Sequence, residues 1–147
     1  FHFNLSHSGD WVVCAVDSLP IGIDVERIHD VDLNLSKRFF AKEEHNYLES
    51  LDGYKRMEAF FELWTLKESY IKADGRGLAI PLNSFSFSFD EGNIQFKASD
   101  SSEKYYFKQY DIDPSYKLSV CARNTDFPEV ITFLAFDELA SLAKKYL

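Results

Sequence analysis

The sequence is short of the residues that mark several protein classes: it has two cysteines, four prolines and no long apolar run among 147 residues. Cys14 and Cys121 lie far apart in apolar segments, so we expect buried free thiols in a reducing, cytoplasmic compartment rather than a disulfide scaffold. No apolar run approaches the ~18 residues of a membrane span, so no membrane association is predicted.

Basic residues are also scarce, with 16 Lys and Arg against 24 Asp and Glu and a net charge of −8. This balance excludes a general nucleic-acid binder, because such a protein needs a basic face. It leaves room for a phosphate ligand that is held by a few local cations or by a metal ion.

Core-forming residues are plentiful: 46% are hydrophobic, and 14 Phe and 8 Tyr are present. The length and this composition predict one domain over residues 1–147. An apolar alternation is already under way at Phe1, Phe3 and Leu5. We therefore expect an N-terminal part that the sequence does not contain.

Apolar periodicity predicts an α+β fold in which helices pack on an antiparallel sheet. Residues 11–16 and 21–26 are expected to form a hairpin, and 85–89 with 94–98 a second one. The remaining expected strands are 105–110, 116–122 and 130–136. The expected helices are 32–40, 42–51, 54–74 and 137–147.

Two carboxylates share one face of the expected strand 21–26. Because residues i and i+2 of a strand point the same way, Asp24 and Glu26 lie opposite Ile23 and Val25, with Cα atoms roughly 6–7 Å apart. Mg²⁺ prefers oxygen ligands and few protein contacts, so this pair is a candidate cation site. A strand with a solvated acidic face fits the same spacing.

The helical segment 64–72 carries a second candidate pair. Glu68 and Lys72 are four residues apart and share a helix face, where a metal ligand could stand beside a phosphate-binding cation. An ordinary surface ion pair is equally compatible with this spacing. Trp64 is interpreted as a core residue, and the glycines at 75 and 77 as a helix end.

The run Ser6-His7-Ser8-Gly9 is expected in a loop after a strand, where hydroxyls, an imidazole and backbone N–H groups can hold phosphate oxygens. A polar turn and a Ser–His hydrolase are the alternatives. The second is disfavoured because adjacent residues do not easily form a triad and no G-x-S-x-G elbow is present.

Together, these segments resemble the 4′-phosphopantetheinyl transferases of the Sfp type. The resemblance covers nearly the whole chain, and it is carried by FNLSHSG (3–9), GIDVE (22–26), KRFFAKEE (37–44) and WTLKESYIKADGRGL (64–78). It implies a transferase-like α+β fold that forms one half of a pseudo-twofold molecule. It also implies Mg²⁺-dependent transfer of 4′-phosphopantetheine from coenzyme A to a serine of an apo acyl or peptidyl carrier protein, with release of 3′,5′-ADP.

The resemblance assigns roles to particular residues. Asp24, Glu26 and Glu68 would hold Mg²⁺ against the coenzyme A pyrophosphate, which Lys72 would also contact. Ser6 and His7 would contact the 3′-phosphate and nearby groups of coenzyme A. Glu68, Lys72 and Glu44 are the catalytic candidates, and either Glu68 or Glu44 would accept the serine proton.

Carrier proteins are usually acidic, so the net charge of this chain opposes docking and favours a local basic and apolar patch. Lys37, Arg38, Phe39 and Phe40 are the candidates, although the phenylalanines are equally compatible with a core position. A non-catalytic coenzyme A or carrier-protein binding module is the alternative function. A monomer is expected for the two-half enzyme, and a lone half could pair with itself.

Overall fold

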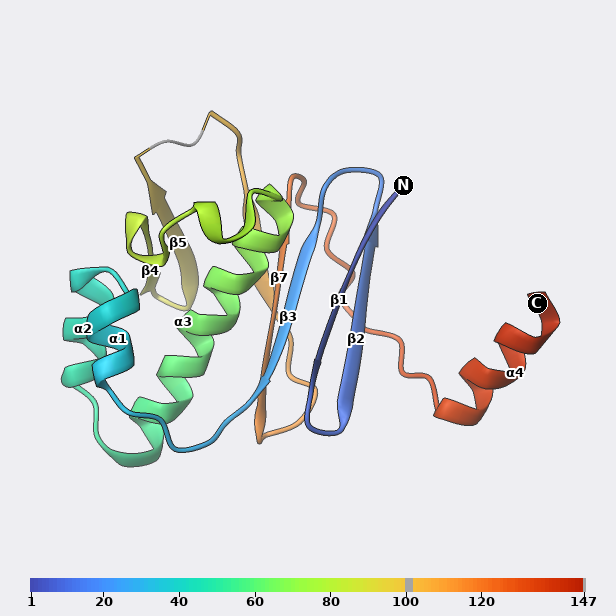
Figure 1. Cartoon of the computed structure of the whole chain (residues 1–147), viewed down its shortest axis with the longest axis horizontal. Coiled ribbons are helices and arrows are strands. Elements are labelled where there is room, and N and C mark those ends of the chain that lie inside the picture. The colour runs from blue at the N-terminus through green and yellow to red at the C-terminus, as the bar shows by residue number, and fades with distance from the viewer. Residues whose placement is uncertain (100–101, 147) are drawn as a thin grey trace.

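The computed structural model describes residues 1–99 and 102–146 and shows the expected mixture of strands and helices (Figure 1). The strands are β1 (His2–Ser8), β2 (Trp11–Asp17), β3 (Gly22–Arg27), β4 (Phe85–Asp90), β5 (Asn93–Ala98), β6 (Tyr106–Gln109) and β7 (Tyr116–Ala122). The α-helices are α1 (Asn34–Phe39), α2 (Lys42–Glu49), α3 (Gly53–Asp74) and α4 (Phe136–Tyr146). Two 3₁₀ turns, η1 (Gly77–Ala79) and η2 (Leu82–Ser84), connect α3 to β4.

The strands form three antiparallel sheets: β1–β2, β3–β7–β6 and β4–β5. The β4–β5 hairpin confirms the predicted pairing of 85–89 with 94–98. The expected pairing of 11–16 with 21–26 is wrong, because β2 pairs with β1 and β3 pairs with β7. The partner of β3 is about 95 residues away in the sequence, and local pattern alone gives no hint of such a distant pairing.

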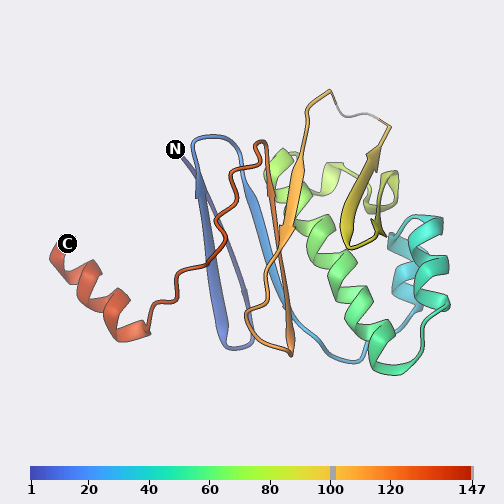
Figure 2. The same ribbon diagram turned by 180° about the vertical axis from the view of Figure 1, so that it is seen from behind.

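Helix α3 crosses one face of the β3–β7–β6 sheet, as Figures 1 and 2 show from opposite sides. Ile23 and Val25 of β3 pack on the other face with Leu118 and Val120 of β7. The larger core surrounds α3 and includes residues from α2, β4 and β7. The acidic side chains of β3 therefore face α3, as the period-two alternation predicts.

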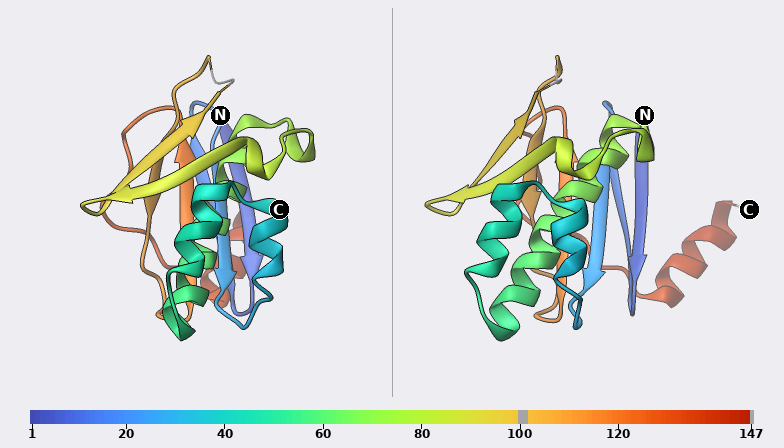
Figure 3. Two further views of the ribbon diagram at one scale, coloured as in Figure 1. Left: turned by 90° about the vertical axis from the view of Figure 1, so that its left-hand side faces the viewer. Right: turned by 60° about the vertical axis from the view of Figure 1, so that its left-hand side comes forward.

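Helices α1 and α2 pack beside α3, and the β4–β5 hairpin projects from the body of the molecule (Figure 3). The end of α3 is confirmed at Gly75, which has a left-handed φ of +85°. Trp64 is half-buried and stacks on Phe60, with ring centroids 5.9 Å apart, so its interpretation as a core residue is confirmed.

Two predictions about apolar segments are wrong. The segment 130–136 is not a strand; it leads into α4, which lies apart from the body and buries none of its described residues (Figures 1 and 2). Cys14 is a free thiol but is exposed, because it faces outward from the β1–β2 hairpin, whereas Cys121 is free and buried. No helix within the described ranges is long and apolar enough to cross a membrane.

Candidate functional site

The site lies where α3 meets β3, and Gly22 allows that approach. A Cβ atom at position 22 would lie 2.0 Å from the Ser69 carbonyl oxygen and 2.6 Å from the Ala73 backbone nitrogen. Only a glycine fits beneath the helix backbone at this distance. The close contact brings Glu68 and Lys72 on α3 to the acidic face of β3.

Asp24 occupies the centre of this contact, with a side chain that is only 5% exposed. Its Oδ1 atom accepts hydrogen bonds from Lys72 Nζ at 2.7 Å and from Ser6 Oγ at 3.0 Å. Lys72 also donates to the Ile23 carbonyl at 3.0 Å. The charged partner of Lys72 is thus Asp24, rather than Glu68 on its own helix.

Glu26 and Glu68 complete an acidic cluster with Asp24. Burial raises the pKa of all three carboxyls. The negative charge of Asp24 raises the pKa of both Glu26 and Glu68, whereas Lys72 opposes the rise at every member of the cluster. The carboxyls are therefore close enough to repel one another, and one lysine does not balance them.

The cluster has the donor chemistry of a divalent-cation site. Among the residues that the structure describes, the Oδ2 atom of Asp24 is buried with no hydrogen-bond partner, and such an oxygen normally has one. Carboxylate oxygens are the ligands that Mg²⁺ takes from proteins, usually one or two at a time. Within residues 1–99 and 102–146, however, no three His, Cys, Asp or Glu side chains stand close enough to form a complete metal site. The residues fit a cation that takes few protein ligands.

Ser6 and His7 do not lie together, contrary to their expected place in one loop. Both belong to β1, where adjacent side chains point to opposite faces. Ser6 is buried against β3, where it contacts Asp24. His7 is exposed on the outer face of the hairpin.

Glu44 lies elsewhere, in a buried ion pair with Lys67. The two charged groups are 2.8 Å apart, and neither side chain is exposed. Glu44 also accepts the backbone N–H groups of Ala41 and Phe87, at 2.9 and 2.8 Å. Lys67 donates to the Leu82 and Phe85 carbonyls. The structure does not bring Glu44 to the acidic cluster. Instead, the ion pair of Glu44 and Lys67 joins α2, α3 and β4.

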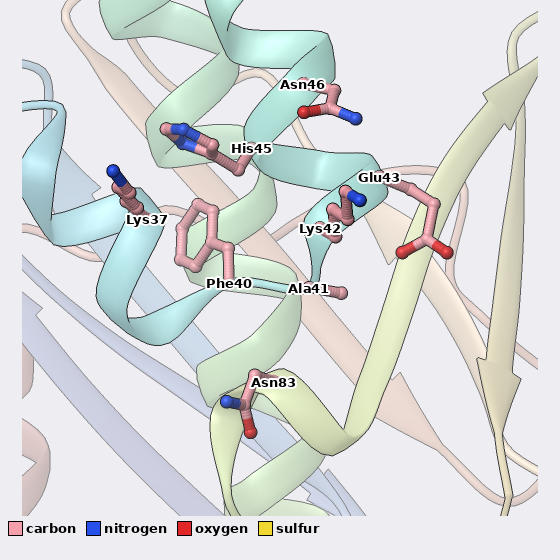
Figure 4. Close-up of a pocket in the computed structure, with 8 residues that line it drawn as sticks. All are labelled: Lys37, Phe40, Ala41, Lys42, Glu43, His45, Asn46 and Asn83. Carbon is pink, nitrogen blue, oxygen red and sulfur yellow. The ribbon is translucent and has the colours of Figure 1, made fainter.

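The segment 37–40 divides between surface and core. Phe40 is 4% exposed and stacks on Phe60, so it belongs to the core. Lys37 is exposed, and Arg38 lies over the Phe39 ring at 5.0 Å. An open pocket of about 480 Å³ lies beside them. Figure 4 shows its lining: Lys37, Phe40, Ala41, Lys42, Glu43, His45, Asn46 and Asn83.

Sequence reasoning gave Lys67 no role and named Ser8 only within a run that could hold phosphate oxygens, not as a partner of a carboxylate. Ser8 Oγ donates to Glu26 Oε2 at 3.4 Å, and Lys67 is among the largest fully buried side chains. The period-two spacing of Asn4, Ser6 and Ser8 would have indicated Ser8 had the segment been assigned to a strand. Nothing local indicates that Lys67 is buried, because its partners come from three other segments.

The chain is similar to proteins of one family. A family model described as the 4′-phosphopantetheinyl transferase superfamily matches residues 20–121. The 4′-phosphopantetheinyl transferase Sfp of Bacillus subtilis is 47% identical over 139 residues, which are 94% of this chain and 62% of that protein. A human L-aminoadipate-semialdehyde dehydrogenase-phosphopantetheinyl transferase is 28% identical, over 86% of this chain and 47% of its own length. This chain thus spans less than two thirds of the length of these relatives.

Solved structures show the same fold at low identity. The holo-[acyl-carrier-protein] synthase of Thermotoga maritima has a TM-score of 0.60 at 18% identity, over 70% of this chain and 61% of that one. The Bacillus anthracis synthase, solved in complex with CoA (3′,5′-ADP), has a TM-score of 0.58 at 19% identity, over 70% of this chain and 93% of that one. These matches confirm the α+β transferase-like fold.

Proposed function

Because the chain belongs to the 4′-phosphopantetheinyl transferase superfamily, we propose that it transfers 4′-phosphopantetheine from coenzyme A to a serine of an apo acyl or peptidyl carrier protein. The serine oxygen attacks the β-phosphate of coenzyme A, and 3′,5′-ADP leaves. The observation that carries this proposal is the unpartnered, buried Oδ2 of Asp24, whose charge also raises the pKa of the Glu26 and Glu68 carboxyls.

Asp24, Glu26 and Glu68 would hold Mg²⁺, one or two of them directly and the rest through water that the ion keeps, since they supply hard oxygen donors on two elements that pack closely. When bound, the ion neutralises the carboxylates and supplies positive charge for the phosphoryl oxygens. Without such a cation the cluster would repel a diphosphate. The buried, unpartnered oxygen of Asp24 and the mutual repulsion of the three carboxyls support this assignment.

Lys72 is the side chain best placed to serve the substrate phosphates. Its ammonium already lies 2.7 Å from Asp24 Oδ1, at the edge of the acidic cluster, and its side chain is 26% exposed. A cation there can stabilise charge on the leaving phosphate, in a reaction that depends mainly on positioning and electrostatics.

Glu68 is the better candidate for the group that accepts the serine proton. It is half-buried rather than enclosed, and burial together with the charge of Asp24 raises its pKa toward the working range of a general base. Glu44, the other candidate, is 1% exposed and already accepts one ammonium and two backbone N–H groups. Its carboxylate oxygens are therefore enclosed by these partners and are not open to a substrate.

The coenzyme A contacts proposed for Ser6 and His7 fall on two faces of the hairpin. Ser6 can approach a phosphate only from the Asp24 side. His7 shares the outer face with exposed apolar side chains of Phe3, Leu5 and Val12. Apolar groups gathered in this way usually pack against protein. This supports a nucleotide site between His7 and a further protein unit, consistent with the expected N-terminal half.

The carrier protein would dock on the exposed side of α1. Lys37 and Arg38 are exposed on α1, where Leu35 is 40% exposed, and Lys42 is exposed at the start of the neighbouring α2. This local positive charge suits an acidic partner despite the net charge of −8. Phe40 takes no direct part, because it is buried. The two free cysteines support a reducing, cytoplasmic setting for the reaction.

Mass measurement of a carrier protein tests the proposal. Purified protein is incubated with coenzyme A, Mg²⁺ and an apo carrier, both as this chain and as the full natural protein. We expect the carrier to gain one phosphopantetheine, and Asp24→Asn and Glu68→Gln each to abolish the gain. Asp126→Asn is the matched control, since it removes an exposed carboxylate far along the chain.

The outcomes separate the candidate functions. No gain in carrier mass from either protein refutes the transferase. Binding of coenzyme A that requires Mg²⁺ but never modifies the carrier would identify the non-catalytic binding module instead. Loss of transfer in Asp126→Asn as well as in the site variants would show that the loss is unspecific.

A further inference from the structure

Strand β3 is an edge strand on the side that faces β1, and its N–H groups on that side pair with none of the strands in the described ranges. Its other edge pairs with β7. β1 lies alongside without backbone hydrogen bonds to it, because β1 pairs with β2. The Val25 N–H is buried and the Ile23 N–H is partly buried, where an unpaired donor is costly, so these two N–H groups need acceptors; the Arg27 N–H lies at the exposed end of the strand.

Three side chains of β1 supply those acceptors. Asn4 Oδ1 accepts the Ile23 N–H at 3.0 Å, Ser6 Oγ accepts the Val25 N–H at 3.2 Å, and Ser8 Oγ accepts the Arg27 N–H at 3.0 Å. Donor and acceptor are 19 residues apart in every pair. The two strands therefore run in parallel and in constant register, joined by side chains that act as a ladder.

The two serines of this ladder each make a second bond to a carboxylate. Ser6 Oγ donates to Asp24 Oδ1 at 3.0 Å, and Ser8 Oγ donates to Glu26 Oε2 at 3.4 Å. Each hydroxyl thus joins an acidic side chain to the backbone N–H of the residue after it. A hydroxyl can do this because it both donates and accepts.

The remaining pair of the ladder, Asn4 with the Ile23 N–H, lacks the second bond and is consistent with this pattern. The residue that corresponds to Asp24 and Glu26 at this rung is Gly22, which has no side chain. Because there is no carboxylate at position 22, no hydroxyl donor is needed, and the residue that accepts the Ile23 N–H is Asn4. The residue type at each rung thus matches the bonds available to it.

We propose that Ser8 is a positioning residue for Glu26, as Ser6 is for Asp24, so that β1 sets the spacing of the two carboxylates that take the divalent cation. This inference rests on the proposed function, because it concerns the same cluster. It assigns the second serine of the run Ser6-His7-Ser8 to the carboxylates rather than to a ligand phosphate.

Divalent-cation binding by the printed chain tests this proposal without a catalytic assay. Mn²⁺ is titrated and the free ion is measured by electron paramagnetic resonance, with Mg²⁺ as competitor. Partners that orient metal ligands typically change metal affinity by 10–100-fold, so Ser8→Ala is expected to weaken Mn²⁺ binding about tenfold. Ser8→Thr keeps the hydroxyl on a residue suited to strands and should bind within about twofold of the parent.

Ser18→Ala is the matched control, because Ser18 also donates to a carboxylate, Asp17, at 3.2 Å, but on the exposed turn at the other end of β2. It should bind Mn²⁺ as the parent does. Amide hydrogen exchange gives an independent readout of the ladder: the Arg27 N–H should exchange faster in Ser8→Ala and at the parental rate in Ser18→Ala.

The results distinguish the two proposals. Parental Mn²⁺ affinity in Ser8→Ala, in a chain whose binding is lost in Asp24→Asn, overturns the role of Ser8 and leaves the proposed function standing. A Ser8→Thr variant that binds Mn²⁺ as weakly as Ser8→Ala would likewise overturn it. A parent chain that binds neither ion would overturn the proposed cation site and with it the positioning role.

Discussion

Gly22→Ala should damage both the stability of the fold and the acidic cluster, because the added carbon points at the backbone of α3. The Cβ atom would lie 2.0 Å from the Ser69 carbonyl oxygen. Since such carbon–oxygen contacts are rarely shorter than about 3.3 Å, α3 has to retreat from β3 by about 1.3 Å. Neither colliding group is a flexible side chain that could turn away.

This retreat has calculable consequences. Overpacking of this kind costs about 1–3 kcal/mol, which for a chain of this size lowers the Tm by about 3–10 °C. The Lys72 Nζ to Asp24 Oδ1 distance is 2.7 Å. If the whole shift reached that contact, the distance would lengthen to about 4 Å and the hydrogen bond would be lost. Misplacement by about 1 Å can cost a hundredfold in rate.

Thermal unfolding and Mn²⁺ titration of the same samples measure the two effects. Gly53→Ala is the control: its Cβ meets nothing within 4 Å, but its φ is +54° at the start of α3. It should lose about 1–2 kcal/mol through backbone strain and keep parental Mn²⁺ affinity. Gly22→Ala with parental Tm and parental Mn²⁺ affinity would refute the close packing of α3 on β3.

Three further predictions concern charged groups. Glu44→Gln should lower the free energy of unfolding, measured in urea, by about 3–5 kcal/mol, because it leaves a buried lysine without its charged partner. It should leave Mn²⁺ affinity unchanged, and weaker Mn²⁺ binding would show instead that Glu44 belongs to the acidic cluster. Lys72→Met should strengthen Mn²⁺ binding by the chain, because it removes the ammonium that competes with the ion for Asp24. Weaker Mn²⁺ binding in calorimetry would contradict this. Burial raises the pKa of Glu68, so the folded state holds its proton more tightly than the unfolded state does, and the stability gained from that proton is lost as pH rises. Without metal, Glu68→Gln should therefore gain stability relative to the parent above pH 4.5, the ordinary value of a glutamate, and a difference that is flat with pH would refute the repulsion.

The sequence was sufficient to predict the shared face of Asp24 and Glu26, because strand periodicity is a local property. The same rule separates Ser6 from His7, but it applies only once those residues are assigned to a strand. The segment was expected to be a loop on account of its serines and glycine. Their hydroxyls are used inside the fold as acceptors for β3, which no composition rule anticipates.

Long-range partners account for the remaining errors. The pairing of β3 with β7 joins residues such as Asp24 and Ser119, and only the assembled sheet determines it. Glu44 and Lys67 illustrate the same limit: each belongs to a motif of the family, but neither motif indicates that the two side chains pair and are buried. A motif therefore identified residues that matter without telling whether they act on substrate or hold the fold.

The arrangement of Asp24 explains how an acidic cluster can exist in a stable fold. Its Oδ1 atom takes both available donors, Ser6 and Lys72, and its Oδ2 atom takes none. One oxygen thus anchors the carboxylate, and the other is the one that the proposed cation would take. Burying an unpaired oxygen beside Glu26 and Glu68 destabilises the folded chain, and a fold selected for stability alone would remove it. If the proposed cation binds there, the role of the polar anchors that fix Asp24 is to hold this destabilising oxygen in place for it.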